Sequence, residues 1–86
     1  MRVVTFGNKD ARYGIILRKL NQEGVSVDNT ITYWMENDIR DIKFMLQRLA
    51  EVENYHKEKN TGIKLDIEVY DYQDMKYITK DVMVYE

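Results

Sequence analysis

Four carboxylates near the end of the chain have the spacing that comes closest to catalytic or metal-binding chemistry. Asp66 and Glu68 alternate along a predicted strand, so both would project from one face about 7 Å apart. With Asp71 and Asp74 nearby, such a pair could act as acid and base or bind a hard cation. The order of ligands is not that of an EF-hand, and carboxylates are common on solvent-facing strands. We therefore expect no catalytic residue and no enzymatic activity.

The other reactive side chains are too sparse for a metal or cofactor site. His56 is the only histidine and there is no cysteine, which excludes a Cys–His nucleophile. Glu53 and His56 would share a helix face, as in half of a carboxylate-bridged di-metal site, but the second half is missing. Gly7-Asn8-Lys9 follows a predicted strand as a phosphate-binding turn would, yet the further glycines of such motifs are absent. We expect neither metal nor cofactor.

The spacing of apolar residues predicts the helices and strands that position these side chains. Apolar residues recur with helical spacing at Tyr13, Ile16, Leu17 and Leu20 and end before Gly24. The strongest helix prediction has a cap at Asn37 or Asp38 and a long apolar stripe. The predicted elements are strand 2–6, a helix with its cap at Asn8 or Asp10 and its end at Gly24, strand 25–35, helix 38–59, strand 63–72 and strand 76–85, with a helix over 73–84 as the alternative for the last.

This β-α-β-α-β-β order predicts an α/β or α+β fold with a mixed four-stranded sheet and two helices. With 86 residues, residues 1–86 should form a single domain. The hydrophobic fraction of 44% suffices for an ordinary core, so disorder is not expected. Without disulfides, apolar packing must stabilise the fold, and a homodimer would add to it. The absence of cysteine, of a signal peptide and of a long apolar run favours a cytoplasmic protein.

Residues 2–28 resemble the beginning of a glutaredoxin. A strand that ends in an aromatic residue is followed by a Lys/Asp turn, and Ala11-Arg12-Tyr13-Gly14 stands where the family has Cys-x-x-Cys. The resemblance implies a thioredoxin-like core that lacks the last helix. Both cysteines are missing, and Thr61-Gly62-Ile63 stands in place of the family's cis-proline. A protein of this kind would be redox-inactive, because thiol–disulfide exchange requires a thiolate.

Charge and aromatic content then indicate where a partner would bind. Residues 1–50 hold eight basic and six acidic residues, whereas residues 51–86 hold five basic and nine acidic ones. The acidic part is also rich in tyrosine, a residue enriched at protein interfaces. The predicted partner-binding residues are Trp34, Asp66, Glu68, Tyr70, Asp71, Tyr72 and Asp74.

These features favour a non-enzymatic module that binds another protein. Small charged chains of this style are frequent among phage and mobile-element products that inhibit or redirect a host protein. A nucleic-acid-binding protein is the alternative, although the net charge of −2 disfavours it. Its basic residues would gather if the two predicted helices packed together: Arg12, Arg18, Lys19, Arg40, Lys43 and Arg48. The redox-inactive glutaredoxin-like protein is a further alternative, and no membrane association is expected.

Overall fold

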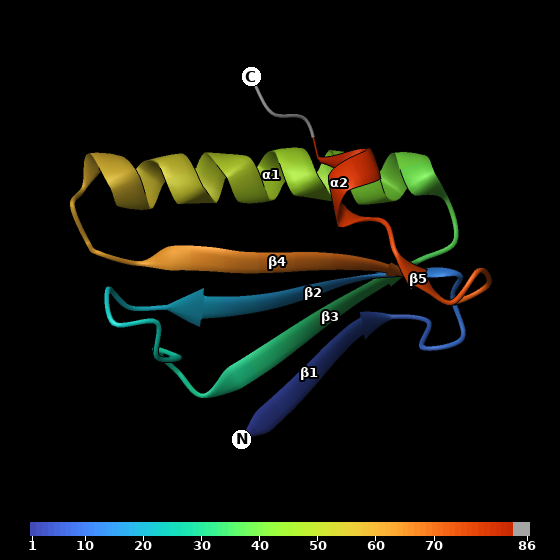
Figure 1. Cartoon of the computed structure of the whole chain (residues 1–86), viewed down its shortest axis with the longest axis horizontal. Coiled ribbons are helices and arrows are strands. Elements are labelled where there is room, and N and C mark those ends of the chain that lie inside the picture. The colour runs from blue at the N-terminus through green and yellow to red at the C-terminus, as the bar shows by residue number, and fades with distance from the viewer. Residues whose placement is uncertain (84–86) are drawn as a thin grey trace.

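A computed structural model describes residues 1–83, which form a five-stranded mixed sheet and two helices (Figure 1). The strand order is β1-β3-β2-β4-β5, with β1 parallel to β3 and every other pair antiparallel. The elements are β1 (Arg2–Gly7), β2 (Tyr13–Leu20), β3 (Thr30–Glu36), α1 (Ile39–Glu58), β4 (Lys64–Asp71), β5 (Lys76–Tyr77) and α2 (Thr79–Val82). The predicted mixed sheet with two helices is thus confirmed, but with five strands rather than four.

The predicted helix between its cap at Asn8 or Asp10 and Gly24 is wrong, because its apolar segment, Tyr13–Leu20, is β2, at the centre of the sheet. It pairs with β3 on one side and with β4 on the other. Ile15 and Leu17 lie on one face and Ile16 lies on the other, so the apolar run serves both faces of a central strand. A short run of this kind also satisfies helical spacing by coincidence. The thioredoxin-like core, which needs a helix between the first two strands, is not confirmed.

Most of the remaining elements agree with the predictions. β1, α1 and β4 are confirmed, and Asp38 caps α1 by accepting the Arg40 backbone N–H at 2.9 Å. β3 starts at Thr30 rather than at residue 25, because Val25 and Val27 lie in an exposed loop.

Of the predicted last strand, only Lys76–Tyr77 is a strand, and the alternative of a helix over 73–84 is met only by the short helix α2 at Thr79–Val82. Residues 84 and 85 of the predicted strand lie outside the described residues. No helix within residues 1–83 is long and apolar enough to cross a lipid bilayer.

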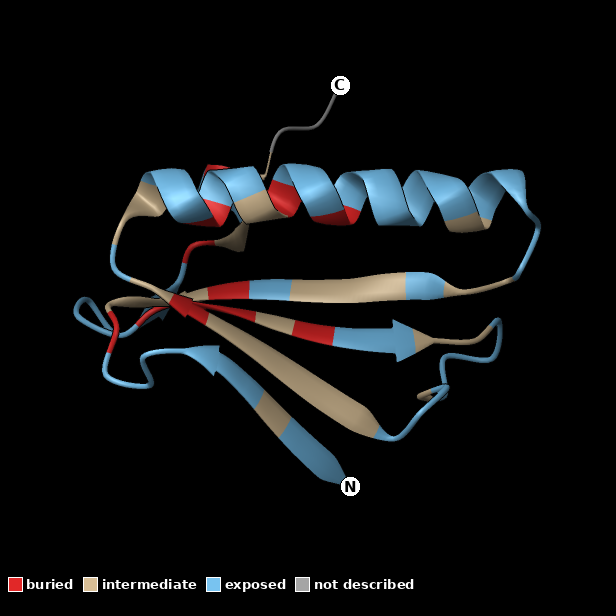
Figure 2. Cartoon of the chain, turned by 180° about the vertical axis from the view of Figure 1, so that it is seen from behind, coloured by how far each residue is buried: buried red, intermediate tan, exposed pale blue. Residues whose placement is uncertain are grey.

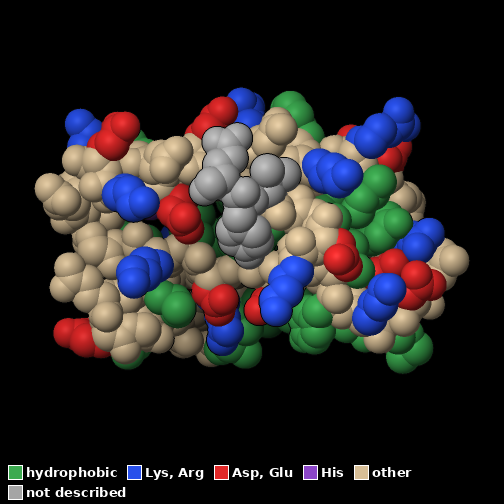
Figure 3. All heavy atoms as spheres, turned by 45° about the horizontal axis from the view of Figure 1, so that its top comes forward, with side chains coloured by type: hydrophobic (Ala, Val, Ile, Leu, Met, Phe, Trp, Pro, Cys, Tyr) green, Lys and Arg blue, Asp and Glu red, His purple; other side chains and the backbone are tan. Residues whose placement is uncertain are grey.

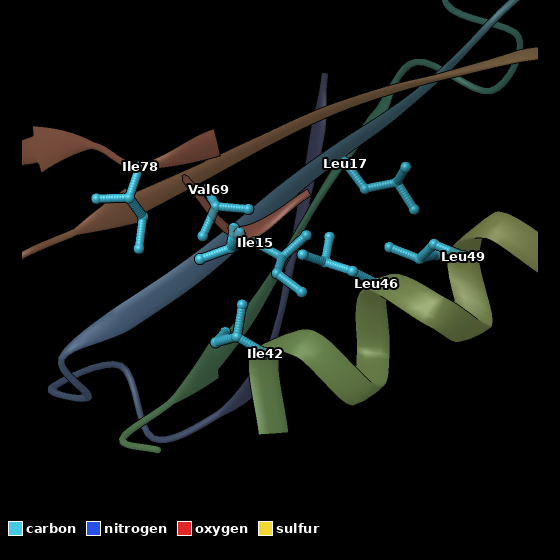
Figure 4. Packing of buried hydrophobic residues seen from close by; sticks show 8 residues of the cluster. Ile15, Leu17, Ile42, Leu46, Leu49, Val69 and Ile78 are labelled. Carbon is cyan, nitrogen blue, oxygen red and sulfur yellow. The ribbon is translucent and has the colours of Figure 1, made fainter. Parts of the chain in front are cut away.

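The hydrophobic core lies between α1, α2 and one face of the sheet (Figure 4). Ile15, Ile42 and Val69 are completely buried at its centre. Ile42, from α1, and Val82, from α2, belong to the same cluster, so both helices cover the same face. Buried residues gather where β3 and β4 end and β2 begins, whereas the opposite end of the sheet is more exposed (Figure 2).

Candidate functional site

The opposite face of the sheet carries no helix in the described part of the chain. The strand register shows which residues lie on this face, because residues directly opposite each other on paired strands point to the same side of the sheet. Ile16 lies opposite Tyr33 on β3 and opposite Glu68 on β4, while Tyr70 lies opposite Tyr77 on β5. We call the tyrosines of this side, which are Tyr33, Tyr70, Tyr72 and Tyr77, the tyrosine face.

The rings of the tyrosine face contact one another. Tyr70 makes edge-to-face contacts with Tyr72 and with Tyr77, each with ring centroids 4.9 Å apart. Tyr72 is 42% exposed and Tyr77 is 62% exposed. Edge-to-face pairs hold aromatic rings in defined orientations, so this surface is ordered before any partner binds. Partial burial raises the pKa of Tyr72, and the neighbouring phenol groups of Tyr33, Tyr70 and Tyr77 raise it further.

The Tyr72 ring packs over Gly14, which has no side chain to displace it. A Cβ atom added to Gly14 would lie 2.9 Å from the Met35 sulfur and 3.0 Å from Cε2 of Tyr72. Both side chains therefore lie directly over the bare backbone of Gly14. The Tyr72 backbone N–H also donates to the Arg12 carbonyl at 2.7 Å, which continues the pairing beyond the end of β4. Gly14 lies in the segment that was predicted to be a helix, so this role was missed.

Two predicted carboxylates, Asp66 and Glu68, do lie on the side of the tyrosine face. Asp66 forms an ion pair with Arg18 at 2.6 Å. Glu68 accepts a hydrogen bond from the Thr79 hydroxyl at 2.8 Å. Both charges are thus engaged within the chain, so the surface has more aromatic than acidic character. No step of acid–base catalysis follows from this arrangement, since the two groups point to different partners.

The predicted partner residue Asp71 is not on that surface, because its side chain is buried with 3% exposure. The Arg12 guanidinium donates to both Asp71 carboxylate oxygens, at 3.2 and 3.1 Å. The same carboxylate accepts the backbone N–H groups of Gln73 and Asp74 and thereby shapes the turn before β5. Hydrogen bonding from Arg12 lowers the pKa of Asp71 against the opposing effect of burial. Asp74 extends this cluster, with its carboxylate 3.6 Å from Arg12.

The predicted partner residue Trp34 lies on the face that the helices cover. It is opposite Ile15 in the register, packs against the core cluster and is half-buried. Its ring stacks on Phe6 from β1, with centroids 5.5 Å apart. Trp34 therefore packs against a second layer of this protein and does not lie on the open face.

The six basic residues of the alternative prediction do not form a common patch. Arg18 lies on the open face of the sheet, whereas Lys43 and Arg48 lie on α1 at the other side. Arg12 and Arg40 are held by carboxylates of their own chain, Asp71 and Asp38 respectively. Where α1 comes forward, Figure 3 shows basic and acidic side chains interleaved. This arrangement gives no continuous positive surface for a phosphate backbone.

A groove of about 510 Å³ lies between the end of α1 and the start of β4. Glu53 and His56 line it, but His56 Nδ1 lies 3.0 Å from the Thr61 hydroxyl and is thereby engaged at the helix end. Within residues 1–83 no three histidine, aspartate or glutamate side chains are grouped so that they could hold a metal. The groove thus offers space without a converging set of reactive groups.

Comparisons with protein-family models, with curated proteins and with solved structures give no match for this chain. The functional argument therefore depends on the surface chemistry of the chain itself. The predicted partner-binding residues do not include two members of the tyrosine face, Tyr33 and Tyr77. The alternation of Tyr33 with Ile31 and Met35 along β3 is the sequence signal that could have placed Tyr33 on one face of the sheet.

Proposed function

We propose that this protein is a non-enzymatic module that binds another protein through the tyrosine face. The observation that carries the proposal is the row of edge-to-face contacts from Tyr72 through Tyr70 to Tyr77 on an uncovered sheet face. Tyrosine contributes strongly to protein interfaces because a rigid ring buries apolar area and loses little rotamer entropy. Its hydroxyl group finds a hydrogen-bonding partner at the same time.

The surroundings of these rings indicate the chemistry of the partner surface. Ile16 and Ile31 on the same side are half-buried, which gives the patch an apolar floor. Glu68 precedes Tyr70 on the same face of β4, and Asp66, further along that face, forms an ion pair with Arg18. A complementary surface would supply apolar side chains for the rings and an arginine or lysine for the carboxylate border.

A module of this kind would act by occupying a surface that its partner needs for another interaction. This is how a small phage or mobile-element protein would inhibit or redirect a host protein. The proposal requires no cofactor and no reacting group. A redox-inactive glutaredoxin-like protein would act through its surface too, but nothing in the geometry of β2 favours that interpretation.

The test is capture of partners from a bacterial lysate with matched surface variants. The double variant Tyr72→Ser and Tyr77→Ser removes two exposed rings from the tyrosine face. Tyr55→Ser with Phe44→Ser removes two comparably exposed rings from α1, at 55% and 60% exposure, and serves as the control. We expect a stoichiometric protein with the wild type and with the α1 variant, and its loss with the tyrosine-face variant.

Three results would contradict this proposal. One is loss of the captured protein with the α1 variant alone. Another is equal capture by both variants. The third is recovery of nucleic acid alone, in a salt-sensitive manner, which would support the alternative function. Circular dichroism of each variant must match that of the wild type, so that a loss of binding is not a loss of fold.

A further inference from the structure

The first strand, β1, has a free hydrogen-bonding edge. It pairs with β3 on one side only, and no other described strand lies beside it. The Arg2 backbone N–H donates to the Asn29 carbonyl at 2.9 Å, so the polar groups of Arg2 point toward β3. Because these groups alternate along a strand, those of Val4 also point toward β3, while those of Val3 and Thr5 point outward. The outer edge therefore presents unpaired donors and acceptors.

This edge lacks the features that normally prevent strands from pairing. Natural edges are protected by proline, by bulges, by lysine or by a covering element. Within β1, Arg2 is the only charged residue, and its sequence RVVTFG contains no proline. Val3 is 56% exposed and Phe6 is 49% exposed, so apolar area accompanies the free backbone groups on both faces.

We propose that the edge of β1 binds the same edge of a second copy of this chain, antiparallel, with the two-fold axis passing beside Val4. In this register Val3 of each copy lies opposite Thr5 of the other, and these residues carry the outward backbone groups. They can therefore exchange N–H···O bonds as a hydrogen-bonded pair. Val4 lies opposite Val4 of the second copy as a non-hydrogen-bonded pair, because its backbone groups are committed to β3.

The side chains favour this register and this partner. Arg2 lies opposite Phe6 of the second copy, on the same face of the extended sheet. The Phe6 ring already stacks on Trp34 at an interplanar angle of 16°, so the guanidinium meets an extended aromatic surface. The two Arg2 side chains lie at opposite ends of the seam and do not repel each other. A shift that placed Thr5 opposite Thr5 would move Arg2 opposite Asn8, beyond the strand, and shorten the overlap.

Such a dimer also has a consequence for the tyrosine face. A two-fold axis perpendicular to the sheet places the helices of both copies on the same side. The helix α1 packs mainly over β2, β3 and β4 rather than over β1, the strand at which the second copy would bind. The two tyrosine faces then lie on one continuous sheet. The dimer does not depend on the proposed binding function, because β1 contributes no tyrosine to it.

Disulfide trapping tests the register directly, because the natural chain has no cysteine. A Val4→Cys variant would place two thiols across a non-hydrogen-bonded pair, with Cα atoms about 4.5 Å apart, within the range that a disulfide spans. We expect its covalent dimer to form at least about tenfold faster than that of Val25→Cys, an exposed loop position. Thr5→Cys should also be slow, since its opposite residue is Val3. Equal rates for the three variants, or fastest trapping of Thr5→Cys, would overturn the proposal.

Sedimentation of the uncrosslinked protein provides the second test. We expect a dimer at about 100 µM, in the range of weak specific association. Thr5→Pro should be monomeric, because it removes an outward N–H and leaves the bonds to β3 intact, and it should melt at the same temperature as wild-type protein diluted until it is monomeric. Thr5→Ser, which keeps that N–H, should remain dimeric. A wild-type chain that is monomeric at this concentration, or a Thr5→Pro variant that remains dimeric, would overturn the proposal.

Discussion

The two faces of this sheet are built by alternate residues of the same strands, and yet they differ in chemistry. On the covered face Ile15 and Val69 are completely buried beneath α1. On the open face their immediate neighbours, Ile16 and Tyr70, are only half-buried. The centre of the covered face, beneath the helices, is aliphatic. The open face combines tyrosine rings, hydroxyl groups and paired charges. The open face can remain in contact with water, whereas the covered face must be packed against the helices.

The largest expected difference between the faces is in stability. Ile15→Ala should lower the free energy of unfolding by about 2–5 kcal/mol, because it leaves a cavity among residues that α1 holds in place. Ile16→Ala should cost only about 1 kcal/mol, since its side chain is already partly in water. Urea denaturation of both variants measures the contrast. Equal losses would mean that the open face is as closely packed as the covered one, and the tyrosine face would then not be a free surface.

A second contrast compares a buried carboxylate with an exposed one. Asp71→Asn should lower the melting temperature at neutral pH by several degrees, because the Arg12 guanidinium loses its charged partner. Asp66→Asn, which removes the carboxylate of the more exposed Arg18 pair, should change it little. Scanning calorimetry of the two variants provides the comparison. If Asp66→Asn had the larger effect, the charge pairs of the open face would be part of the fold rather than of a binding surface.

The pH dependence of the Asp71 effect has a definite sign. Its pKa in the folded protein lies below the ordinary value of 3.8, so the unfolded chain binds the proton first. The contribution of Asp71 to stability is complete above pH 3.8, and it is lost as the pH falls through the lower pKa of the folded state. The melting temperatures of the wild type and Asp71→Asn should therefore converge in acid. Asp38, whose pKa its hydrogen bonds with Arg40 lower to about 2, leaves both proteins with a shared acid dependence.

Some elements of the fold could be predicted from local sequence patterns, and others could not. The helix α1 was predictable, because a cap at Asp38 and a long stripe containing Ile42 and Leu46 agree on one structure. The strand β4 was predictable from strict alternation. The segment 13–20 was not, because its apolar residues lie on both faces of a central strand and show no strict alternation, and the partner strand β4 is distant in sequence. Tertiary pairing decided its conformation, and local spacing favoured the wrong one.

The candidate site was predictable to a similar extent. Tyr70, Tyr72, Asp66 and Glu68 follow from the alternation of β4, so their common side was foreseeable. The burial of Asp71 was not, because it depends on Arg12, fifty-nine positions earlier in the chain. No local sequence pattern indicates the Arg12–Asp71 pair, because the two residues come together only when β2 pairs with β4.

The smallest effect concerns the protonation of the tyrosine face. Tyr72 has a pKa above the ordinary value of 10.0, because partial burial disfavours its phenolate. Because the pKa of Tyr72 is higher in the folded protein than in the unfolded chain, its contribution to stability is complete below pH 10.0. This contribution is lost as the pH rises through the pKa of the folded state. The melting temperature of the wild type should thus fall more steeply above pH 10.0 than that of Tyr72→Phe, which has no proton to lose there. Thermal melts across the alkaline range, monitored by circular dichroism, measure the two slopes. Identical slopes would place the Tyr72 hydroxyl in bulk water, and the rings would then be independent side chains rather than a surface ordered before binding.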